Sequence, residues 1–429
     1  MKKIVILIVP ILLFGENYEE IIKKAENSLT LKSASYLQKS ANFLYKSEKG
    51  KNLPSLDASL KAARLKDTPM MYMHLPLFPI TELPMGKKNR FEGEISLKYP
   101  LFSGFAISSL IDKAKFKDKE AKLKVKDLKR NLYLKTTYIF SAAASLDFSI
   151  QALKEAKKAI TLAYKKAKGL YENNLLPLSD LYNIKAKKYE IEAKITETKA
   201  NKQKLLNTLS YILNSPVNSI SFSKNDLKVP KKEKIIKEAL KKREDIEALK
   251  YALKIDQKDI DLAKSSLYPK VGLIASLKRE GDSLKLNGDG YTNADKSYVG
   301  ASVSMNIFNG FSDKYKIEAA KMKRLSTLYA FKDYTNKVKS DIENAYVELK
   351  ALKAKLKSAQ METKAKEEYY KLTKGRFENQ LADADELSRS IADLAAARAK
   401  RGAIESQIFS QKAKILLMGG LERFEKNFR

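Results

Sequence analysis

The chain has 429 residues and no cysteine, which excludes disulfides, thiolate metal sites and a lipid-modified N-terminal cysteine. Its single histidine, His74, cannot form a histidine-rich metal site or a relay between two imidazoles. The chain has 83 Lys and Arg residues and 51 Asp and Glu residues, and its net charge of +32 makes nucleic acid one partner to consider. The lysines are interleaved with glutamates at helical spacing, as in residues 187–204, so the pattern favours solvated helix faces and no nucleic-acid site.

Residues 1–15 have the layout of a secretory signal peptide, with two lysines, an apolar run and then Gly15. The apolar run, residues 4–14, is too short to span a bilayer. We therefore expect an exported mature chain that begins near Glu16. The alternative is that the segment is retained as an N-terminal anchor.

Residues 16–48 are predicted to form one helix, which is followed by a strand over 53–64 in which apolar and polar side chains alternate. A second strand, 91–103, has the same alternation. The connection between them is a loop by composition, although residues 70–80 are unusually apolar. That stretch is either an extracellular loop that packs over a pore mouth or an irregular hydrophobic plug. His74 within it is interpreted as an ordinary loop residue.

Residues 106–213 are predicted to form a long helical hairpin, because neither Pro nor Gly interrupts the first helix before Gly169. At 1.5 Å per residue, about 60 residues make a rod about 90 Å long. The return helix carries apolar residues in coiled-coil-like spacing. An irregular segment, 214–230, follows, and we expect a short strand at 219–222 within it.

The second half of the chain has the same order of elements. A helix is predicted over 231–267, strands over 268–279 and 297–309, and a second long hairpin over 312–418. Residues 419–429 form a C-terminal tail without a predicted fold.

The two halves, residues 16–230 and 231–418, are interpreted as a duplicated structural repeat. Matching positions lie at an offset of 206 residues, from Phe102 to Phe308. The match covers the strand-to-helix junctions, which contain Phe102, Gly104, Phe105, Phe308, Gly310 and Phe311. It also covers the hairpin tips, which contain Tyr171, Asn173, Leu175, Phe377, Asn379 and Leu381.

The four alternating strands are each about ten residues long with one apolar face, which is the pattern of an outer-membrane β-barrel. Four strands cannot close into a barrel, and an open edge in lipid leaves backbone groups unpaired at several kcal/mol each. The chain must therefore take strands from copies of itself. Eight strands from a dimer enclose an interior about filled by side chains, so a homotrimer with twelve strands is the smallest ring with an open pore.

The sequence resembles the TolC family of outer-membrane efflux and secretion channels over essentially the whole mature chain. The resemblance rests on the strand ends PLFSGF and NIFNGF, the tip turns YENNLLPLSDL and FENQLADADEL, and residues 245–273, which lead from a helix into a strand. It implies a mainly α protein with membrane β strands: a trimer with a twelve-stranded barrel in the Gram-negative outer membrane and a periplasmic α-barrel of coiled-coil hairpins. A mixed equatorial region is implied near residues 214–235 and the tail.

Membership implies a passive channel without a cofactor, which an inner-membrane transporter engages through a periplasmic adaptor. The sequence agrees, since it has no phosphate loop, no metal-ligand cluster and no nucleophile-base pair. Two alternatives are an exported coiled-coil structural protein, which would have no use for the amphipathic strands, and a periplasmic adaptor, which would need a lipoyl-like β domain between its helices. The cargo stays open among small molecules, metal ions and polypeptides.

The resemblance also implies an acidic constriction at the periplasmic tips. Glu386 falls at the first pore-facing position of the second tip, whereas the second position holds Arg389, a departure from the family pattern. Asp383 could supply the second acid, because residues three apart share a helix face. The alternative is that Asp383 and Asp385 only cap the return helix. Asp180 in the first tip matches a position that links neighbouring tips, but its arginine partner is absent here.

Overall fold

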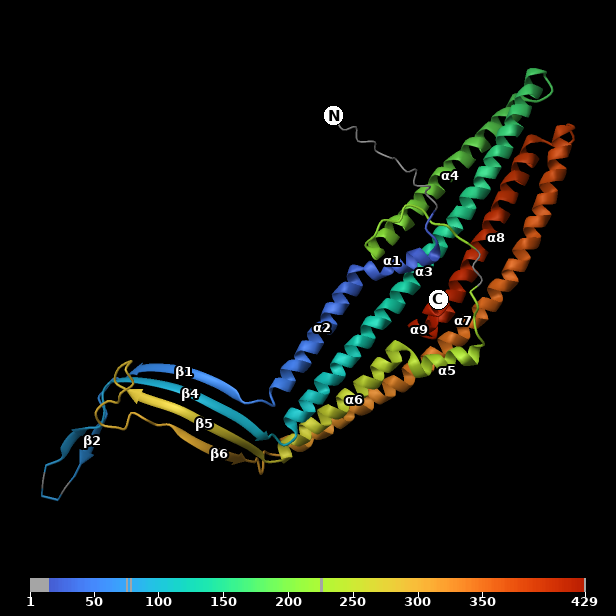
Figure 1. The fold of residues 1–429 in the computed structure, drawn as a ribbon. Coiled ribbons are helices and arrows are strands. Elements are labelled where there is room, and N and C mark those ends of the chain that lie inside the picture. Colours follow the sequence, from blue (N-terminus) through green and yellow to red (C-terminus); the bar gives the residue numbers. More distant parts are fainter. Residues whose placement is uncertain (1–14, 75, 78, 224–226, 428–429) are drawn as a thin grey trace, which may run out of the picture. The chain divides into compact units, whose positions relative to one another are not determined.

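A computed structural model describes residues 15–74, 76–77, 79–223 and 227–427 (Figure 1). The predicted signal peptide, apart from Gly15, lies outside these residues. The chain divides into two compact units. The helical unit comprises residues 1–37, 122–248 and 331–429, and the sheet unit comprises 38–121 and 249–330.

The sheet unit is built on a four-stranded antiparallel sheet with the order β1-β4-β5-β6. Its strands are β1 (Ser55–Arg64), β4 (Asn89–Phe102), β5 (Lys270–Gly281) and β6 (Tyr298–Ser304). The last strand ends five residues before the predicted end at 309. The same unit contains the 3₁₀ turn η2 (Ser265–Leu267), which leads into β5.

A separate two-stranded hairpin, β2 (Met70–Met73) with β3 (Thr81–Pro84), lies between β1 and β4 in the chain. The prediction of an irregular loop or plug over residues 70–80 is therefore wrong at its beginning, where the chain pairs as a strand. The reason is that a short run of Met and Tyr side chains suits a pleated ladder when a complementary strand follows closely. His74 directly follows β2 and is exposed.

Both strand-to-helix junctions bend through two consecutive residues with positive φ. These are Gly104 (63°) and Phe105 (67°) before the first long helix, and Gly310 (66°) and Phe311 (63°) before the second. A Cβ on Gly104 would lie 2.6 Å from the carbonyl oxygen of Ser265, so only glycine fits there.

Each junction also carries an edge-to-face pair of phenylalanine rings. The ring centroids of Phe102 and Phe105 are 5.1 Å apart, and those of Phe308 and Phe311 are 5.4 Å apart. The 206-residue offset seen in the sequence therefore joins positions with the same backbone and ring geometry.

The helical unit contains most of two long helical hairpins (Figure 1). One consists of α3 (Ala106–Glu172) and α4 (Leu178–Leu213), and the other of α7 (Ser312–Glu378) and α8 (Ala384–Met418). Buried side chains from all four helices form one cluster that includes Ile160, Ile184, Phe377 and Leu387. Among the described residues, no helix has both the length and the apolar character needed to cross a membrane.

The N-terminal helix is broken, so the prediction of one helix over 16–48 is wrong. The structure has α1 (Tyr18–Lys24), a 3₁₀ turn η1 (Ala25–Asn27) and α2 (Leu29–Gly50). Ser28 is buried with extended ψ between them. The break lets α1 pack into the helical core. There the ring of Tyr18 lies edge-on against that of Phe409 of α8, with the ring centroids 4.8 Å apart.

Three further segments differ from the sequence prediction. The helix predicted over 231–267 is interrupted at Arg243, which separates α5 (Lys232–Lys242) from α6 (Glu244–Lys264). Instead of a strand at 219–222, an isolated parallel bridge joins Glu16 and Ile220. The C-terminal tail, predicted without a fold, contains α9 (Leu421–Glu425), whose Leu421 and Phe424 are buried. These residues belong to the same core as Tyr18 and Phe409.

Two glycines in the long helices give a matched test of packing. A Cβ at Gly402 of α8 would collide with the Phe148 side chain of α3, whereas a Cβ at Gly375 of α7 would meet nothing within 4 Å. We expect Gly402→Ala to destabilise the fold by about 1–3 kcal/mol through overpacking. Gly375→Ala should be neutral or stabilise it by up to about 1 kcal/mol through higher helix propensity. Thermal unfolding followed by circular dichroism measures both, and equal shifts would contradict the close approach of α3 and α8.

Candidate functional site

The four-stranded sheet has one apolar face. Directly opposed residues share a face, so Leu56, Leu97, Ala275 and Val299 form one apolar row across all four strands. The rest of this apolar face includes Ala58, Leu60, Ile95, Tyr99, Leu273, Leu277, Ala301 and Val303. The exposed fraction is 68% for Leu277 and 84% for Val299. A continuous exposed apolar surface of this kind marks contact with lipid or protein.

The opposite face is polar and pairs its own charges. Glu92 of β4 accepts from Lys61 of β1 at 2.9 Å and lies 3.1 Å from the ammonium of Lys278 of β5. Lys278 in turn lies 3.0 Å from Glu280. This polar face can border water while the apolar face borders lipid, which is the division of an outer-membrane strand.

The two edge strands of this sheet, β1 and β6, each pair on one side only among the described residues. Their outer backbone N–H and C=O groups have no ladder partner within the sheet. Because unpaired backbone groups cannot be placed in lipid without a large cost, both edges need another strand if this sheet lies in a membrane.

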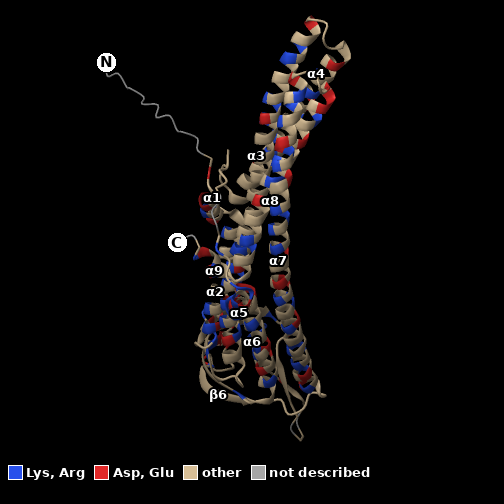
Figure 2. Ribbon diagram, turned by 90° about the vertical axis from the view of Figure 1, so that its right-hand side faces the viewer, with Lys and Arg blue, Asp and Glu red and all other residues tan. Residues whose placement is uncertain are grey.

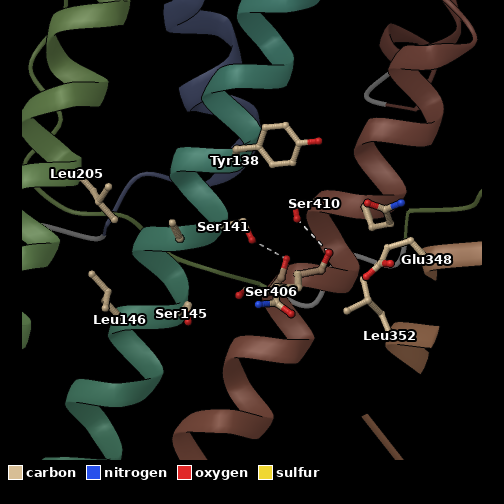
Figure 3. A pocket seen from close by; sticks show the side chains of 12 residues that line it. Tyr138, Ser141, Ser145, Leu146, Leu205, Glu348, Leu352, Ser406 and Ser410 are labelled. Carbon is tan, nitrogen blue, oxygen red and sulfur yellow. Dashed lines mark hydrogen bonds between the residues drawn. The ribbon is translucent and has the colours of Figure 1, made fainter. Parts of the chain in front are cut away.

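In the helical unit, α3, α4, α7 and α8 line a groove of about 540 Å³ (Figure 3). Ser141 on α3 donates a hydrogen bond to the carbonyl oxygen of Ser406 on α8 at 2.7 Å. The lining contains Glu348 as its single carboxylate, with serines, glutamines and apolar side chains around it. The lining residues therefore include no histidine, lysine or second carboxylate that could act with the serines or with Glu348 as an acid-base pair.

A buried charged cluster holds the break between α5 and α6. Arg243 donates to both carboxylate oxygens of Asp245, at 2.6 and 2.8 Å among its contacts, and the hydroxyl of Tyr334 donates to the same carboxylate at 2.7 Å. Burial opposes ionisation of Asp245, but these donors outweigh it and hold the pKa of that carboxyl below its usual value. The pairing fixes the Arg243 backbone outside the helix.

The neighbouring Glu244 ties the C-terminal tail to this cluster. Its carboxylate accepts from the backbone N–H of Leu421 at 2.9 Å, at the start of α9. Burial raises the pKa of Glu244, and the Leu421 N–H and the guanidinium of Arg130 oppose that rise. This contact explains why the tail has an ordered helix.

The two hairpin tips have the same backbone turn. Asn174 (φ 58°) and Gln380 (φ 62°) end α3 and α7 in the left-handed conformation. At the first tip the N–H of Leu175 donates to the Leu170 carbonyl, and the N–H of Leu381 donates to the Arg376 carbonyl at the second, both at 2.8 Å. This is the Schellman arrangement. The Asn173 and Asn379 side chains donate in the same way to the carbonyls of Gly169 and Gly375.

The predicted tip side chains differ in exposure. Tyr171, Leu175 and Leu381 are exposed, whereas Phe377 is buried. Asp180 lies in the first turn of α4.

The predicted acidic residues of the second tip are brought together, but each has a local partner. Asp383 caps α8 by accepting from the backbone N–H of Glu386 at 2.6 Å. Glu386 accepts from Arg376 of α7 at 2.9 Å. Asp385 pairs with Arg389 at 2.9 Å. Sequence reasoning missed Arg376, although a basic residue in the last turn before an acidic return helix is a signal for such a pair.

The charges of the helices are distributed as solvated faces. Figure 2 shows Lys and Arg interspersed with Asp and Glu along the helices. Many pair within one helix, as Lys321 does with Glu318 and Lys371 with Glu368. Within the described ranges, no three His, Cys, Asp or Glu side chains form a group that could hold a metal ion.

Part of the chain matches a known sequence family. Residues 235–415 match the sequence family described as Outer membrane efflux protein. No curated protein is significantly similar in sequence.

Solved structures share the fold at low sequence identity. The chain is similar to the CmeC outer membrane channel of Campylobacter jejuni, with a TM-score of 0.78 and 16% identity over 94% of this chain and 85% of that one. It is similar to the outer membrane protein VceC of Vibrio cholerae, with a TM-score of 0.76 and 15% identity over 94% and 96%. It is also similar to the MtrE outer membrane channel of Neisseria gonorrhoeae in its open state. The TM-score is 0.70, and the identity is 16% over 94% of this chain and 89% of that one.

These findings confirm the predicted resemblance to the TolC family and the predicted fold class. The chain therefore has the fold of these outer-membrane channels, and part of its second half matches the efflux family.

The two faces of the sheet give a prediction about lipid contact. Leu97 and Val303 lie on the apolar face, and Lys98 and Ser302 lie on the polar face. Arg at Leu97 or Val303 should cost about 2–4 kcal/mol per chain if the site is near the bilayer midplane, because a charged side chain is then placed in lipid.

Arg at Lys98 or Ser302 is the matched control and should cost little. Chemical unfolding of protein inserted in lipid vesicles measures the difference. Similar costs on the two faces would show that the apolar face does not contact lipid.

Proposed function

We propose that three copies of this chain assemble into a passive export channel of a tripartite efflux pump or type I secretion system. The observation that carries the proposal is the sheet: it has an exposed apolar face, an ion-paired polar face and two unpaired edges. Closing the sheet with strands of other copies pairs every edge, turns the apolar face to lipid and encloses a polar lumen.

The strand directions support this closure. Successive strands in the order β1-β4-β5-β6 are antiparallel, so β1 and β6 run in opposite directions. The β6 strand of one copy can therefore pair with β1 of the next without interrupting the antiparallel pattern. Three copies make a ring of twelve strands, which leaves a lumen. A coiled-coil structural protein would leave the sheet without a use.

In this assembly the long hairpins extend into the periplasm as a tunnel. A periplasmic adaptor and an inner-membrane transporter are the partners that the efflux family match supports. The cargo class covers small molecules, metal ions and polypeptides.

Cysteine cross-linking tests the trimer, because the natural chain has no cysteine and only the introduced thiols can react. One cysteine replaces Ala58 on β1, and a second replaces Val299, Ala301 or Val303 on β6 in three separate double variants. Oxidation of the membrane-inserted protein should give a ladder that stops at three chains, because the ring is closed. A ladder that stops at two, or continues beyond three, would overturn the trimer, as would a soluble periplasmic monomer.

We also propose that Asp383 and Glu386 line a constriction at the periplasmic end. They lie one turn apart at the start of α8, and threefold repetition would place six carboxylates around one opening. Arg376 neutralises part of this charge within each chain. The ring would attract cations, and multivalent cations would bind several carboxylates at once and block the channel.

Single-channel conductance in a planar bilayer tests the ring. A trivalent cation on the periplasmic side should block the natural channel, and Asp383→Asn with Glu386→Gln should abolish block, since the carboxylates are lost. Asn still caps a helix, so the turn is retained. Asp385→Asn is the matched control and should leave block intact, because Asp385 does not share the helix face of Asp383 and Glu386, which lie three residues apart. If the double variant is blocked as strongly as the natural channel, Asp383 and Glu386 do not bind the cation, and Asp383 serves only as a helix cap.

A further inference from the structure

The β2–β3 hairpin concentrates the chain's methionines. The sequence has nine, and Met70, Met71, Met73 and Met85 lie in or directly beside this one hairpin. Their exposed fractions are 37%, 42%, 38% and 44%. The only histidine of the chain, His74, directly follows β2. Burial does not explain these side chains, because they are exposed, and an apolar hairpin could equally use Leu or Val.

Strand register divides the four methionines between two faces. The strands pair antiparallel from Met70 to Met73, and the N–H of Met85 donates to the Pro69 carbonyl at 2.8 Å, which continues the ladder. Side chains alternate along a strand, so Met71, Met73 and Met85 share one face and Met70 lies on the other. Met71 is the central methionine of this face. Met73 lies two residues further along the same strand, and Met85 is the diagonal neighbour of Met71 across the ladder.

Two thioethers on this face can reach one ion. Diagonal neighbours on a ladder are about 7–8 Å apart, which long side chains can bridge. Methionine is unbranched and has three rotatable bonds, so Met71 can approach either Met73 or Met85.

Ligand chemistry selects the ion. Thioether sulfur is a soft, neutral ligand that favours Cu(I), whereas carboxylate and carbonyl oxygens favour Mg²⁺, Ca²⁺ and Mn²⁺. The hairpin itself, residues 70–73 and 81–84, carries Glu82 as its single carboxylate. We propose that Met71 is the central ligand of a site for a soft monovalent cation, Cu(I) or its analogue Ag(I), with Met73 or Met85 as the second thioether.

The site lies at the loop end of the sheet. The hairpin connects the end of β1 to the start of β4, and the other ends of these strands join α2 and α3 (Figure 1). The proposal does not depend on the number of copies in the assembly or on the cargo of the channel. It rests on one hairpin of a single chain.

Titration of the full chain in detergent tests the site, with Ag(I) followed by calorimetry and Cu(I) followed by competition with a chromophoric chelator. The natural protein should bind both ions and should not lose them to excess Zn²⁺. Met71→Leu keeps the apolar volume but removes the sulfur, and it should weaken binding at least about tenfold, because loss of a ligand should cost no less than loss of a group that only supports one. Met70→Leu is the matched control on the other face and should change binding less than about twofold on the same scale.

Nuclear magnetic resonance of methyl-labelled methionine gives a second, independent measurement. Ag(I) should shift the methyl signal of Met71 together with that of Met73 or Met85, and leave those of Met322 and Met361 in α7 unchanged. The same spectra show whether each variant is folded. The proposal is overturned if the natural protein binds neither ion, if Met70→Leu and Met71→Leu weaken binding equally, or if all methionine signals shift alike.

Discussion

The fold depends on a sheet that one chain cannot complete. Four antiparallel strands leave the backbone of β1 and β6 unpaired on their outer sides and leave residues such as Val299 largely exposed. Water can satisfy the backbone but not the apolar face, and lipid can cover the apolar face but not the backbone. An environment that supplies both lipid and neighbouring strands removes the two costs together. The proposed trimer follows from this constraint.

A second constraint acts at the two strand-to-helix junctions, where the backbone changes from a pleated strand to a helix within a few residues. Each uses a glycine and a phenylalanine in left-handed conformation, and phenylalanine is strained there. Its ring packs edge-to-face on a second phenylalanine three residues earlier. Such a ring pair is worth about 0.5–1.5 kcal/mol beyond its buried area, which offsets part of the cost of the conformation.

The sequence predicted those features that arise from local pattern. Strict alternation located the four strands of the main sheet, because one face is apolar and the other polar along their whole length. Uninterrupted helical sequence predicted the long helices. The short strands β2 and β3 were missed because four residues carry too little periodicity.

The missed helix breaks have tertiary causes. Arg243 leaves the helix because its guanidinium is held by Asp245, which also binds Tyr334, a residue 89 positions further along the chain. The helix α9 exists because Glu244 accepts from its first N–H. At the tips, the acidic residues were found by position, but the pairing of Glu386 with Arg376 depends on how α7 and α8 come together. None of these partners can be read from spacing alone.

The two long helices α3 and α7 each contain 67 residues, and each starts after the same left-handed pair and ends in the same Schellman turn. Inserting one residue in either helix would rotate everything beyond it by about 100° and lengthen it by about 1.5 Å. Its buried stripe would then face the wrong neighbour. Helix length is therefore a property that the two halves of the gene can change only together, and by whole turns. A protein of this design can alter its helix surfaces residue by residue, but the length of its hairpins only by whole turns.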